Sequence, residues 1–169
     1  HLIYEIVDNA VDEHLAGFCK NIHVTLEKDG SATVEDDGRG VPVGMHQKRI
    51  SAARLVYTTL HAGGKFDDSA YKTSGGLHGV GSSVVNALSV YMDVQISREG
   101  YIHHDRYERG GPVVELEDGL LPTIGKTRKT GTKVNFLPDD TIFEKTKFRA
   151  EEVKSRLHET AYLNPELTI

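Results

Sequence analysis

The sequence predicts an α+β fold, a two-layer sandwich in which helices pack on one face of a mixed, mostly antiparallel sheet. Three observations lead to this prediction. The chain has 169 residues, enough for one domain with a buried core. Segments with helical periodicity come mostly first, and a run of short alternating segments follows, separated by glycine or proline turns. This order is typical of helices gathered on one side of an antiparallel sheet.

The expected helices repeat apolar residues every three to four positions. Gly17 is a plausible stop for the first helix. The buried stripe of that helix consists of Ile3, Ile6, Val7, Ala10 and Val11. In the second helix Ala53, Val56 and Leu60 are expected to point inward. The predicted helices are Leu2–Ala16, Ala52–Ala62, Val84–Ser89 and Arg149–Tyr162.

The expected strands alternate apolar and polar residues. The first two form a hairpin through the turn Lys28-Asp29-Gly30. The last residues, Leu167–Ile169, also resemble a strand. The predicted strands before them are Ile22–Leu26, Ala32–Glu35, Met92–Ser97, Tyr101–Tyr107, Val113–Leu116 and Thr132–Phe136.

Composition narrows the class of protein. A net charge of −5 and a pI near 6.0 argue against a general nucleic-acid surface. The single cysteine, Cys19, excludes an internal disulfide and fits a reducing, cytoplasmic location. No apolar run reaches membrane-spanning length, so no membrane association is expected. Because the sequence opens inside an apparent helix and stops in an apparent strand, we expect one domain over residues 1–169 that is cut at both ends.

A glycine-rich stretch, Ser74–Gly81, precedes a helical pattern in which Val80, Val84 and Leu88 form a stripe widened by Val85 and Ala87. A glycine bend that enters a helix leaves backbone N–H groups pointing outward, which favours an anion and most often phosphate. The P-loop template fails because no lysine follows Gly81, and the dinucleotide template fails because Val84 stands at the third glycine position. The alternative is a flexible loop before a buried helix.

The first helix carries an acidic face. Residues 1–19 include acids but no lysine or arginine, and like charges on one helix face repel each other. Such a cluster with Asn9 at its centre favours a cation. Mg²⁺ binds a few oxygen ligands together with water and phosphates. A solvated helix face is the alternative. The face consists of Glu5, Asp8, Asn9 and Asp12, with Glu13 at its margin.

The segment Asp36-Asp37-Gly38-Arg39-Gly40 follows a predicted strand directly, so Asp36 is expected at the strand end, facing a pocket. A carboxylate there accepts a hydrogen bond from an exocyclic amine, which favours adenine over guanine. Arg39 could stack on the flat ligand. The alternative is an ordinary Asp-Gly turn. Among nine histidines, only His78 in the glycine loop is a functional candidate, and it could equally position the loop.

Five ordered motifs together resemble the ATP site of the gyrase, heat-shock chaperone, histidine kinase and mismatch-repair ATPase superfamily, and hence its GHKL (Bergerat) ATP-binding fold. The third and fourth resemble specifically the B subunits of DNA gyrase and topoisomerase IV. The motifs are Glu5–Glu13, Asp36–Pro42, Leu60–Phe66, Ser74–Gly81 and Thr130–Thr132.

The resemblance implies a role for each matching position. Glu5 would be the general base for the attacking water, and Asn9 would hold Mg²⁺. Asp36 would bind the adenine amine with a water shared with Thr132, and Arg39 would lie over the base and pair with Glu13. The remaining implied nucleotide-binding residues are Asp12 beside Glu13, Gly40, Val41 and Pro42 along the pocket, Lys65 and the backbone of Leu77, His78, Gly79, Val80 and Gly81 at the phosphates, and Arg98 at the mouth, where inhibitors bind.

The implied parent enzyme couples ATP hydrolysis to DNA supercoiling or strand passage. Its implied partners are ATP, a second copy of the same chain, the topoisomerase A subunit, DNA and ATP-site inhibitors. The family's N-terminal arm and its transducer domain lie outside the sequence, so this piece is expected to bind ATP and to hydrolyse it poorly as a monomer.

Other functions are weighed against the assignment to gyrase. Topoisomerase IV is the alternative to gyrase, because the wrapping domain that distinguishes the two enzymes belongs to the partner subunit. A chaperone or mismatch-repair ATPase is disfavoured by the segment His61–Phe66. A histidine kinase is disfavoured by Glu5, since a kinase has no use for a water-activating base. A nucleotide-binding module without turnover in isolation also remains open. No role is assigned to the loop Met45–Ser51.

Overall fold

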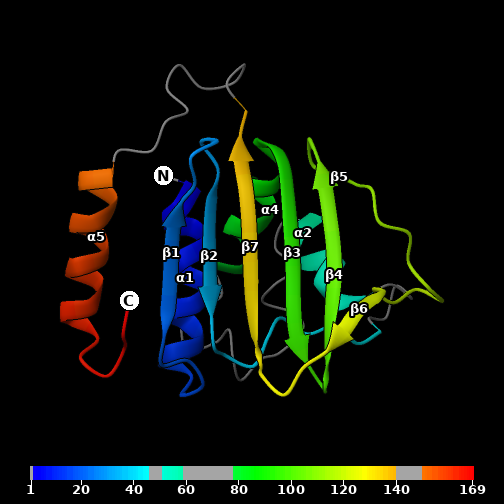
Figure 1. Cartoon of the computed structure of the whole chain (residues 1–169), viewed down its shortest axis with the longest axis horizontal. Coiled ribbons are helices and arrows are strands. Elements are labelled where there is room, and N and C mark those ends of the chain that lie inside the picture. Colours follow the sequence, from blue (N-terminus) through cyan, green and yellow to red (C-terminus); the bar gives the residue numbers. More distant parts are fainter. Residues whose placement is uncertain (1, 46–50, 59–77, 140–149) are drawn as a thin grey trace.

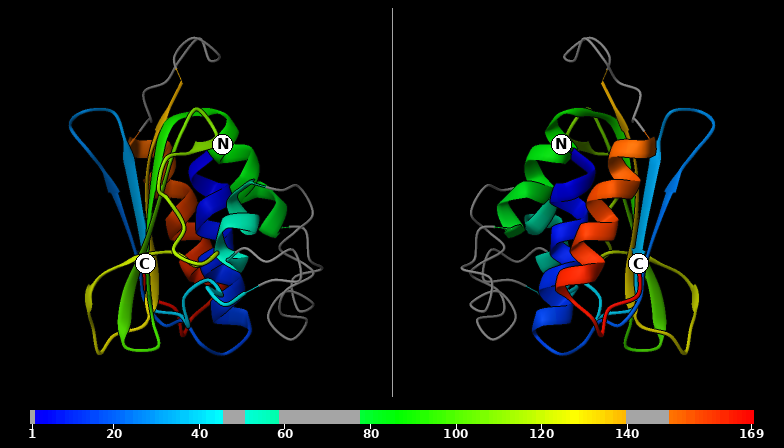
Figure 2. Two further views of the ribbon diagram at one scale, coloured as in Figure 1. Left: turned by 90° about the vertical axis from the view of Figure 1, so that its right-hand side faces the viewer. Right: turned by 90° about the vertical axis from the view of Figure 1, so that its left-hand side faces the viewer.

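The computed structural model describes residues 2–45, 51–58, 78–139 and 150–169. In this part of the chain, the helices lie on one side of a seven-stranded sheet (Figures 1 and 2). The helices are α1 (Leu2–Leu15), α2 (Ala52–Thr58), α4 (His78–Ala87) and α5 (Ala150–Leu163). The strands are β1 (Ile22–Leu26), β2 (Ala32–Asp36), β3 (Ser89–Arg98), β4 (Tyr101–Glu108), β5 (Gly111–Pro112), β6 (Thr123–Lys126) and β7 (Gly131–Pro138).

The strand order is β1-β2-β7-β3-β4-β5, with β6 paired to β4. Every ladder between these named strands is antiparallel. An isolated bridge between Asn21 and Thr168 is parallel. The predicted α+β sandwich with helices on one face is therefore confirmed. The tail Leu167–Ile169 was predicted as a strand, but the structure has only this bridge there.

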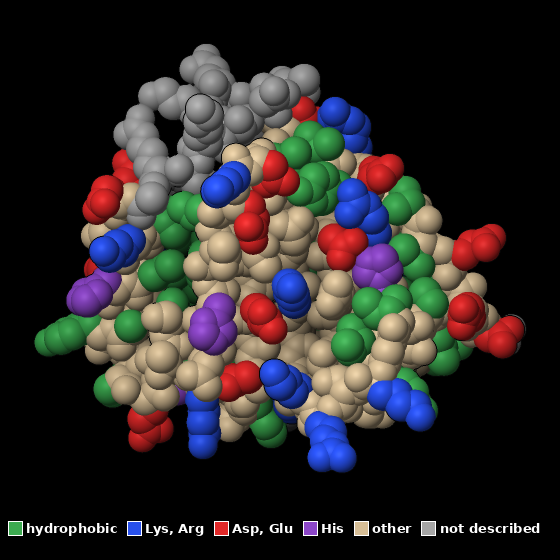
Figure 3. Space-filling view, viewed as in Figure 1, with side chains coloured by type: hydrophobic (Ala, Val, Ile, Leu, Met, Phe, Trp, Pro, Cys, Tyr) green, Lys and Arg blue, Asp and Glu red, His purple; other side chains and the backbone are tan. Residues whose placement is uncertain are grey.

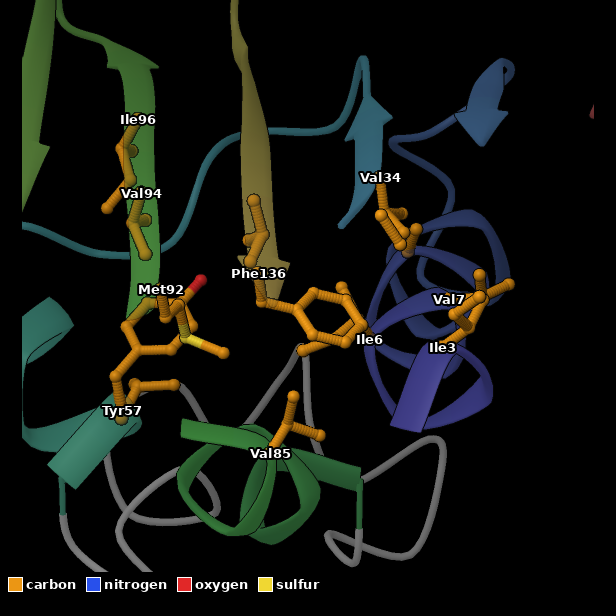
Figure 4. Packing of buried hydrophobic residues seen from close by; sticks show 14 of the residues in the cluster. Ile3, Ile6, Val7, Val34, Tyr57, Val85, Met92, Val94, Ile96 and Phe136 are labelled. Atoms are coloured by element: carbon orange, nitrogen blue, oxygen red, sulfur yellow. The ribbon is translucent and has the colours of Figure 1, made fainter. Parts of the chain in front are cut away.

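The core fills the space between the sheet and the helices. In Figure 4, Ile3, Ile6 and Val7 of α1 and Val85 of α4 lie beneath the side chains of the central strands. The predicted stripe of α1 is confirmed for four residues, while its fifth, Val11, is partly buried. Gly17 ends the helix with a φ of 94°, a left-handed conformation that glycine adopts readily.

The opposite face of the sheet is polar. Figure 3 shows acidic, basic and histidine side chains interspersed over it. Two of its opposite-charge pairs lie directly across neighbouring strands, Glu35 opposite Lys133 and Asp93 opposite Arg106. Alternation along each strand therefore separates an apolar, helix-covered face from a charged one.

The prediction for α4 is partly wrong. The helix begins at His78 and ends at Ala87, and Ser89 already belongs to β3. Val84 and Ala87, placed in the predicted stripe, are exposed. The buried face instead includes Ser82 and Asn86, because these small polar side chains find partners: Asn9 for Ser82, and the Tyr57 carbonyl for the Asn86 amide at 2.8 Å. Apolar periodicity does not detect a buried polar face.

The strand prediction fails at the edge beyond β4. The segment Val113–Leu116 is not a strand, and Val113 is 52% exposed. Conversely, β6 was not predicted, because all four of its residues are exposed and show no alternation. Among the described strands, the short β5 and β6 pair only with β4, so cross-strand packing gives the sequence little pattern there.

A buried ion pair fixes α2 to the sheet. Arg54 donates to both carboxylate oxygens of Asp105 on β4, at 2.6 and 3.1 Å, and also to the Val114 carbonyl at 2.6 Å. The Asp105 side chain is 1% exposed, and the Tyr107 hydroxyl also donates to it. Removing one partner of such a pair leaves the other charge buried and unpaired. The pair therefore holds in place the helix that carries Tyr57.

Candidate functional site

A cavity opens between α1, α2 and the ends of β2, β3 and β7. Ten residues that the sequence singled out line it: Asn9, Asp12, Glu13, Asp36, Arg39, Gly40, Val41, Pro42, Arg98 and Thr132. They come from segments far apart in the sequence, and the register of the sheet brings them together. The structure thus brings these ten residues together around one cavity, and their roles toward a ligand are the subject of the proposal below.

Asp36 is the last residue of β2 and lies directly opposite Thr132 on β7. The Gly38 N–H donates to its Oδ1 at 2.9 Å. Burial raises the pKa of Asp36 to about 7, the neighbouring charge of Glu13 adds to the rise, and the Gly38 hydrogen bond opposes it. A carboxyl that faces a cavity in this state is typical of a binding site.

Two close contacts fix the strand end that carries Asp36. Gly131 has a φ of 149°, and a Cβ added there would overlap the Asp36 carbonyl oxygen. Only glycine therefore lets β7 approach β2 at this point. One residue later, the Thr132 hydroxyl accepts a hydrogen bond from the Val41 N–H at 3.1 Å. The loop after Asp36 is thereby attached to β7.

Glu13 holds Arg39 by three hydrogen bonds. Its Oε2 accepts from the Arg39 backbone N–H at 2.8 Å and from Nε at 3.3 Å, and its Oε1 accepts from Nη2 at 2.8 Å. The guanidinium also lies over the Phe18 ring, with Cζ 3.9 Å from the ring centroid. The expected pairing of Arg39 with Glu13 is confirmed.

Arg98, the last residue of β3, donates from Nη1 to the Gly40 carbonyl at 2.8 Å. Gly40 has a φ of 84°, and an added Cβ would lie 3.0 Å from both Ile96 Cγ2 and the Ser97 carbonyl oxygen. Glycine is therefore required where the loop turns against β3. Val41 and Pro42 follow it along the cavity wall.

Asn9 offers an acceptor that the described residues leave unused. Its Nδ2 donates to Ser82 Oγ on α4, while its buried Oδ1 has no hydrogen-bond partner among the residues that the structure describes. Within the described ranges no three His, Cys, Asp or Glu side chains gather into a metal cluster. An amide oxygen of this kind fits Mg²⁺, which combines few protein oxygens with water and phosphate. Asn9 therefore suits a cation that arrives with a phosphorylated ligand.

Glu5 lies on α1 beside the start of α4. A Cβ added to Gly81 would overlap Glu5 Oε2 and come within 3.0 Å of its Cδ. The missing side chain of Gly81 thus makes room for the Glu5 carboxylate, a function distinct from the phosphate contact that the glycine pattern suggested. From Glu13 to Glu5 the helix rises about 12 Å. One edge of α1 therefore runs from the Asp36 end of the cavity toward the N-terminus of α4.

Several predicted site residues lie wholly or partly beyond what the structure describes. Lys65 and Leu77 fall outside the described residues, as does Leu60 of the predicted second helix. His78, Gly79 and Val80 are described only as the backbone of the first turn of α4. The predictions for these positions stay predictions.

Beyond Val41 and Pro42, the sequence reasoning missed five apolar residues of the cavity wall. Ile6 and Val56 were assigned only to the core, although they also line the cavity. Val34 and Val134 lie opposite each other, two residues from Asp36 and Thr132 respectively. Because side chains two residues apart on a strand share a face, strand alternation could have placed this pair on the same face as Asp36 and Thr132. Nothing in the sequence pattern singled out the fifth residue, Tyr57.

Comparison with known proteins places this site in a family. Residues 1–142 match the family described as histidine kinase-, DNA gyrase B-, and HSP90-like ATPase. The chain belongs to this family. The expected superfamily is therefore confirmed, and the cavity lies within the matched residues. No helix in the described ranges has the length and apolar character needed to cross a membrane.

Two curated relatives are each 54% identical over the whole chain, which spans 26% of their length. They are the B subunits of DNA topoisomerase 4 from Streptococcus pneumoniae and of DNA gyrase from Thermotoga maritima. A solved structure, the 43K ATPase domain of Thermus thermophilus gyrase B in complex with an aminocoumarin, is 42% identical with a TM-score of 0.80. It covers 96% of this chain, and the chain covers 40% of it. The similarity to B subunits of both topoisomerases is thereby confirmed.

Proposed function

We propose that this chain is the ATP-binding and ATP-hydrolysing domain of the B subunit in a type II DNA topoisomerase, either DNA gyrase or topoisomerase IV. The observation that carries the proposal is the Asp36 carboxyl, enclosed at the strand end and facing the cavity beside Thr132. The family match supports ATP as the ligand. The two 54%-identical relatives divide equally between gyrase and topoisomerase 4, so the proposal covers both enzymes.

The adenine amine would donate to Asp36, and the apolar pair Val34 and Val134 would contact the base beside it. A carboxylate accepts from N6–H₂ but repels the oxygen that guanine carries at the same position. Removing the base from water strengthens that discrimination, because a mismatched polar group is then left without a partner. Arg39 would cover one face of the base, held in place by Glu13.

The phosphates would extend along α1 toward α4. The N-terminus of α4, a ten-residue helix, offers backbone N–H groups to an anion. Asn9 Oδ1 would bind Mg²⁺, which when present would neutralise phosphate charge. Lys65 and the Leu77–Gly81 backbone are the further phosphate contacts that we propose.

Hydrolysis would use Glu5 as general base. Its carboxylate lies against Gly81 near the start of α4, where we place the terminal phosphate. There Glu5 would orient a water molecule and accept its proton as the water attacks. Because the chain spans 26% of the length of its relatives, DNA strand passage, ATP-driven pairing of two B subunits and contact with the A subunit belong to the proposal for the whole protein.

The test is calorimetric titration with a non-hydrolysable ATP analogue, with and without Mg²⁺. Asp36→Asn should weaken binding by about 100-fold, because an amide donor then faces the adenine amine. Its matched control is Asp37→Asn, which changes the neighbouring carboxylate outside the cavity lining. A folded Asp36→Asn protein that binds as tightly as the parent would overturn the adenine assignment.

The same titration tests the metal. Asn9→Ala should lose only the Mg²⁺-dependent part of the affinity. Asp8→Asn on the same helix is the control, since Asp8 does not line the cavity. Glu5→Gln should bind the analogue and fail to hydrolyse ATP, measured in a chain extended at both ends if the present one turns over too slowly. Equal turnover of Glu5→Gln and parent would remove Glu5 from the mechanism.

The solved neighbour is a complex with an aminocoumarin, and we propose that this chain binds the same class of inhibitor. Arg98 at the cavity wall would contact it while keeping its hydrogen bond to Gly40.

A further inference from the structure

Phe18 is an exposed aromatic residue whose position the core does not explain. It follows the end of α1 and is 48% exposed, and its N–H donates to the Glu13 carbonyl at 2.9 Å. Its ring lies under the Arg39 guanidinium, at 3.9 Å from Cζ to the ring centroid. The side chain is thus about half buried, and the Arg39 guanidinium is the specific partner that the described residues give its ring.

The arrangement places Arg39 between Phe18 and the cavity. Arg39 lines the cavity, whereas Phe18 does not. Glu13 bonds the edge of the guanidinium, through Nε and Nη2, and leaves its two faces to other contacts. A guanidinium is planar, so a ring against one face leaves the opposite face for a second flat group. Because Arg39 lines the cavity and Phe18 does not, we infer that this second face lies on the cavity side.

We propose that Phe18 is a positioning residue for the nucleotide, which acts by supporting Arg39 from behind so that the guanidinium stacks on the adenine ring. The inference rests on the proposed function. Arginine loses considerable rotamer freedom when it is fixed, and a residue ordered before the ligand arrives lowers the entropic cost of binding. Glu13 fixes the position of the guanidinium along its edge, and Phe18 fixes its tilt.

The test uses a feature of the composition: the chain contains no tryptophan. Phe18→Trp keeps an aromatic face under Arg39 and introduces a unique fluorophore. Phe18→Leu keeps an apolar side chain and removes the face. Leu15 is the matched control, because it is also apolar, lies at the end of α1 and is 54% exposed. All variants are titrated with the non-hydrolysable ATP analogue, and their melting temperatures are compared.

We expect Phe18→Leu to bind about two- to five-fold more weakly than the parent, the range for an exposed cation–π contact. Phe18→Trp should bind at least as tightly as the parent, and its emission should change on addition of the nucleotide. Leu15→Ala should bind normally, and Leu15→Trp should show the smaller change in emission. The melting temperature of Phe18→Leu should fall by no more than a few degrees, because an exposed cation–π contact contributes little to folding stability.

A double-mutant cycle separates support of Arg39 from a direct effect. In an Arg39→Gln background, Phe18→Leu should cause no further loss of affinity. The inference is overturned if Phe18→Leu binds as the parent does, or if its loss persists without Arg39. A parent chain that binds no nucleotide would instead overturn the proposed function and the inference with it, so the two failures are distinguishable.

Discussion

Asp36 and Asp37 are neighbours in the sequence, but their carboxyl groups lie in opposite environments. Asp36 faces the cavity, and burial raises its pKa to about 7. Asp37 is exposed and accepts hydrogen bonds from the backbone N–H groups of Lys20 and Asn21 and from the Asn21 amide, at 2.7–2.9 Å. Partial burial on its own would raise the pKa of Asp37, but these hydrogen bonds outweigh it and hold the pKa at about 2.

The difference separates a binding residue from a structural one. The hydrogen bonds of Asp37 stabilise its charge and attach the start of β1 to the end of β2. In the folded protein, burial destabilises the ionised form of Asp36. A ligand that donates a hydrogen bond to this carboxylate would offset that cost. The comparison yields the following predictions, from the largest expected effect to the smallest.

Gly131→Ala should break the site by displacing Asp36 while leaving the donors of Asp37 in place. The added methyl group would overlap the Asp36 carbonyl oxygen, which is strand backbone and cannot move aside like a side chain. The left-handed φ adds strain. We expect a loss of about 3 kcal/mol or more in the free energy of unfolding. Urea unfolding measures it.

Gly125→Ala is the control for this substitution. Gly125 also lies in a strand, but its added Cβ would meet only Ile102 Cδ1, at an ordinary 3.9 Å. An equal, small loss for both variants would contradict the close approach of β7 to β2 at Asp36.

Asp36→Asn should make the unliganded protein more stable at pH 8. The folded pKa, about 7, lies above the ordinary 3.8, so the folded chain binds more protons than the unfolded chain between these values. Stability from this group therefore falls as the pH rises from about 4 to 7 and is constant above 7. The variant lacks this slope and should gain about 2 kcal/mol at pH 8, since an amide recovers only part of the shift. Unfolding at pH 4, 6 and 8 checks the sign.

Asp37→Asn should do the reverse. The depressed pKa of Asp37 contributes stability that is fully present above about pH 4 and is lost as the pH falls toward 2. Because the side chain is exposed, solvent screening reduces this contribution to about 1 kcal/mol. The variant should lose that amount at pH 7 and keep its nucleotide affinity. A loss of affinity larger than that of Asp36→Asn would contradict the division of roles.

The sequence predicted more of the site than of its surroundings. Asp36, Arg39 and Asn9 stand out because glycine turns and unpaired acids carry a local signal, and the motif spacing linked them. The partners of Asp37 could not be foreseen, since Lys20 and Asn21 are brought to it by the pairing of β1 with β2. Similarly, the buried polar face of α4 depends on Asn9 and Tyr57, which belong to other helices, and apolar periodicity misplaced it.

The edge of the sheet shows the same limit. Thr123–Lys126 forms a strand because β4 offers it a partner, and its own residues carry no alternation of burial. By contrast, β2 and β3 are flanked on both sides, and both were predicted as strands, β2 to within one residue and β3 without its first three residues and its last. Sequence patterns thus report burial well and pairing poorly.

The most direct test of the central claim compares the affinities for non-hydrolysable adenine and hypoxanthine nucleotide analogues at pH 6 and pH 8. Both analogues carry the same phosphates, so phosphate titration cancels in the ratio of their dissociation constants. If the Asp36 carboxylate accepts from the adenine amine, the preference for adenine should be at least about ten-fold larger at pH 8, where a group of pKa near 7 is ionised. A preference that is equal at both pH values, or absent at pH 8, would contradict the role assigned to Asp36.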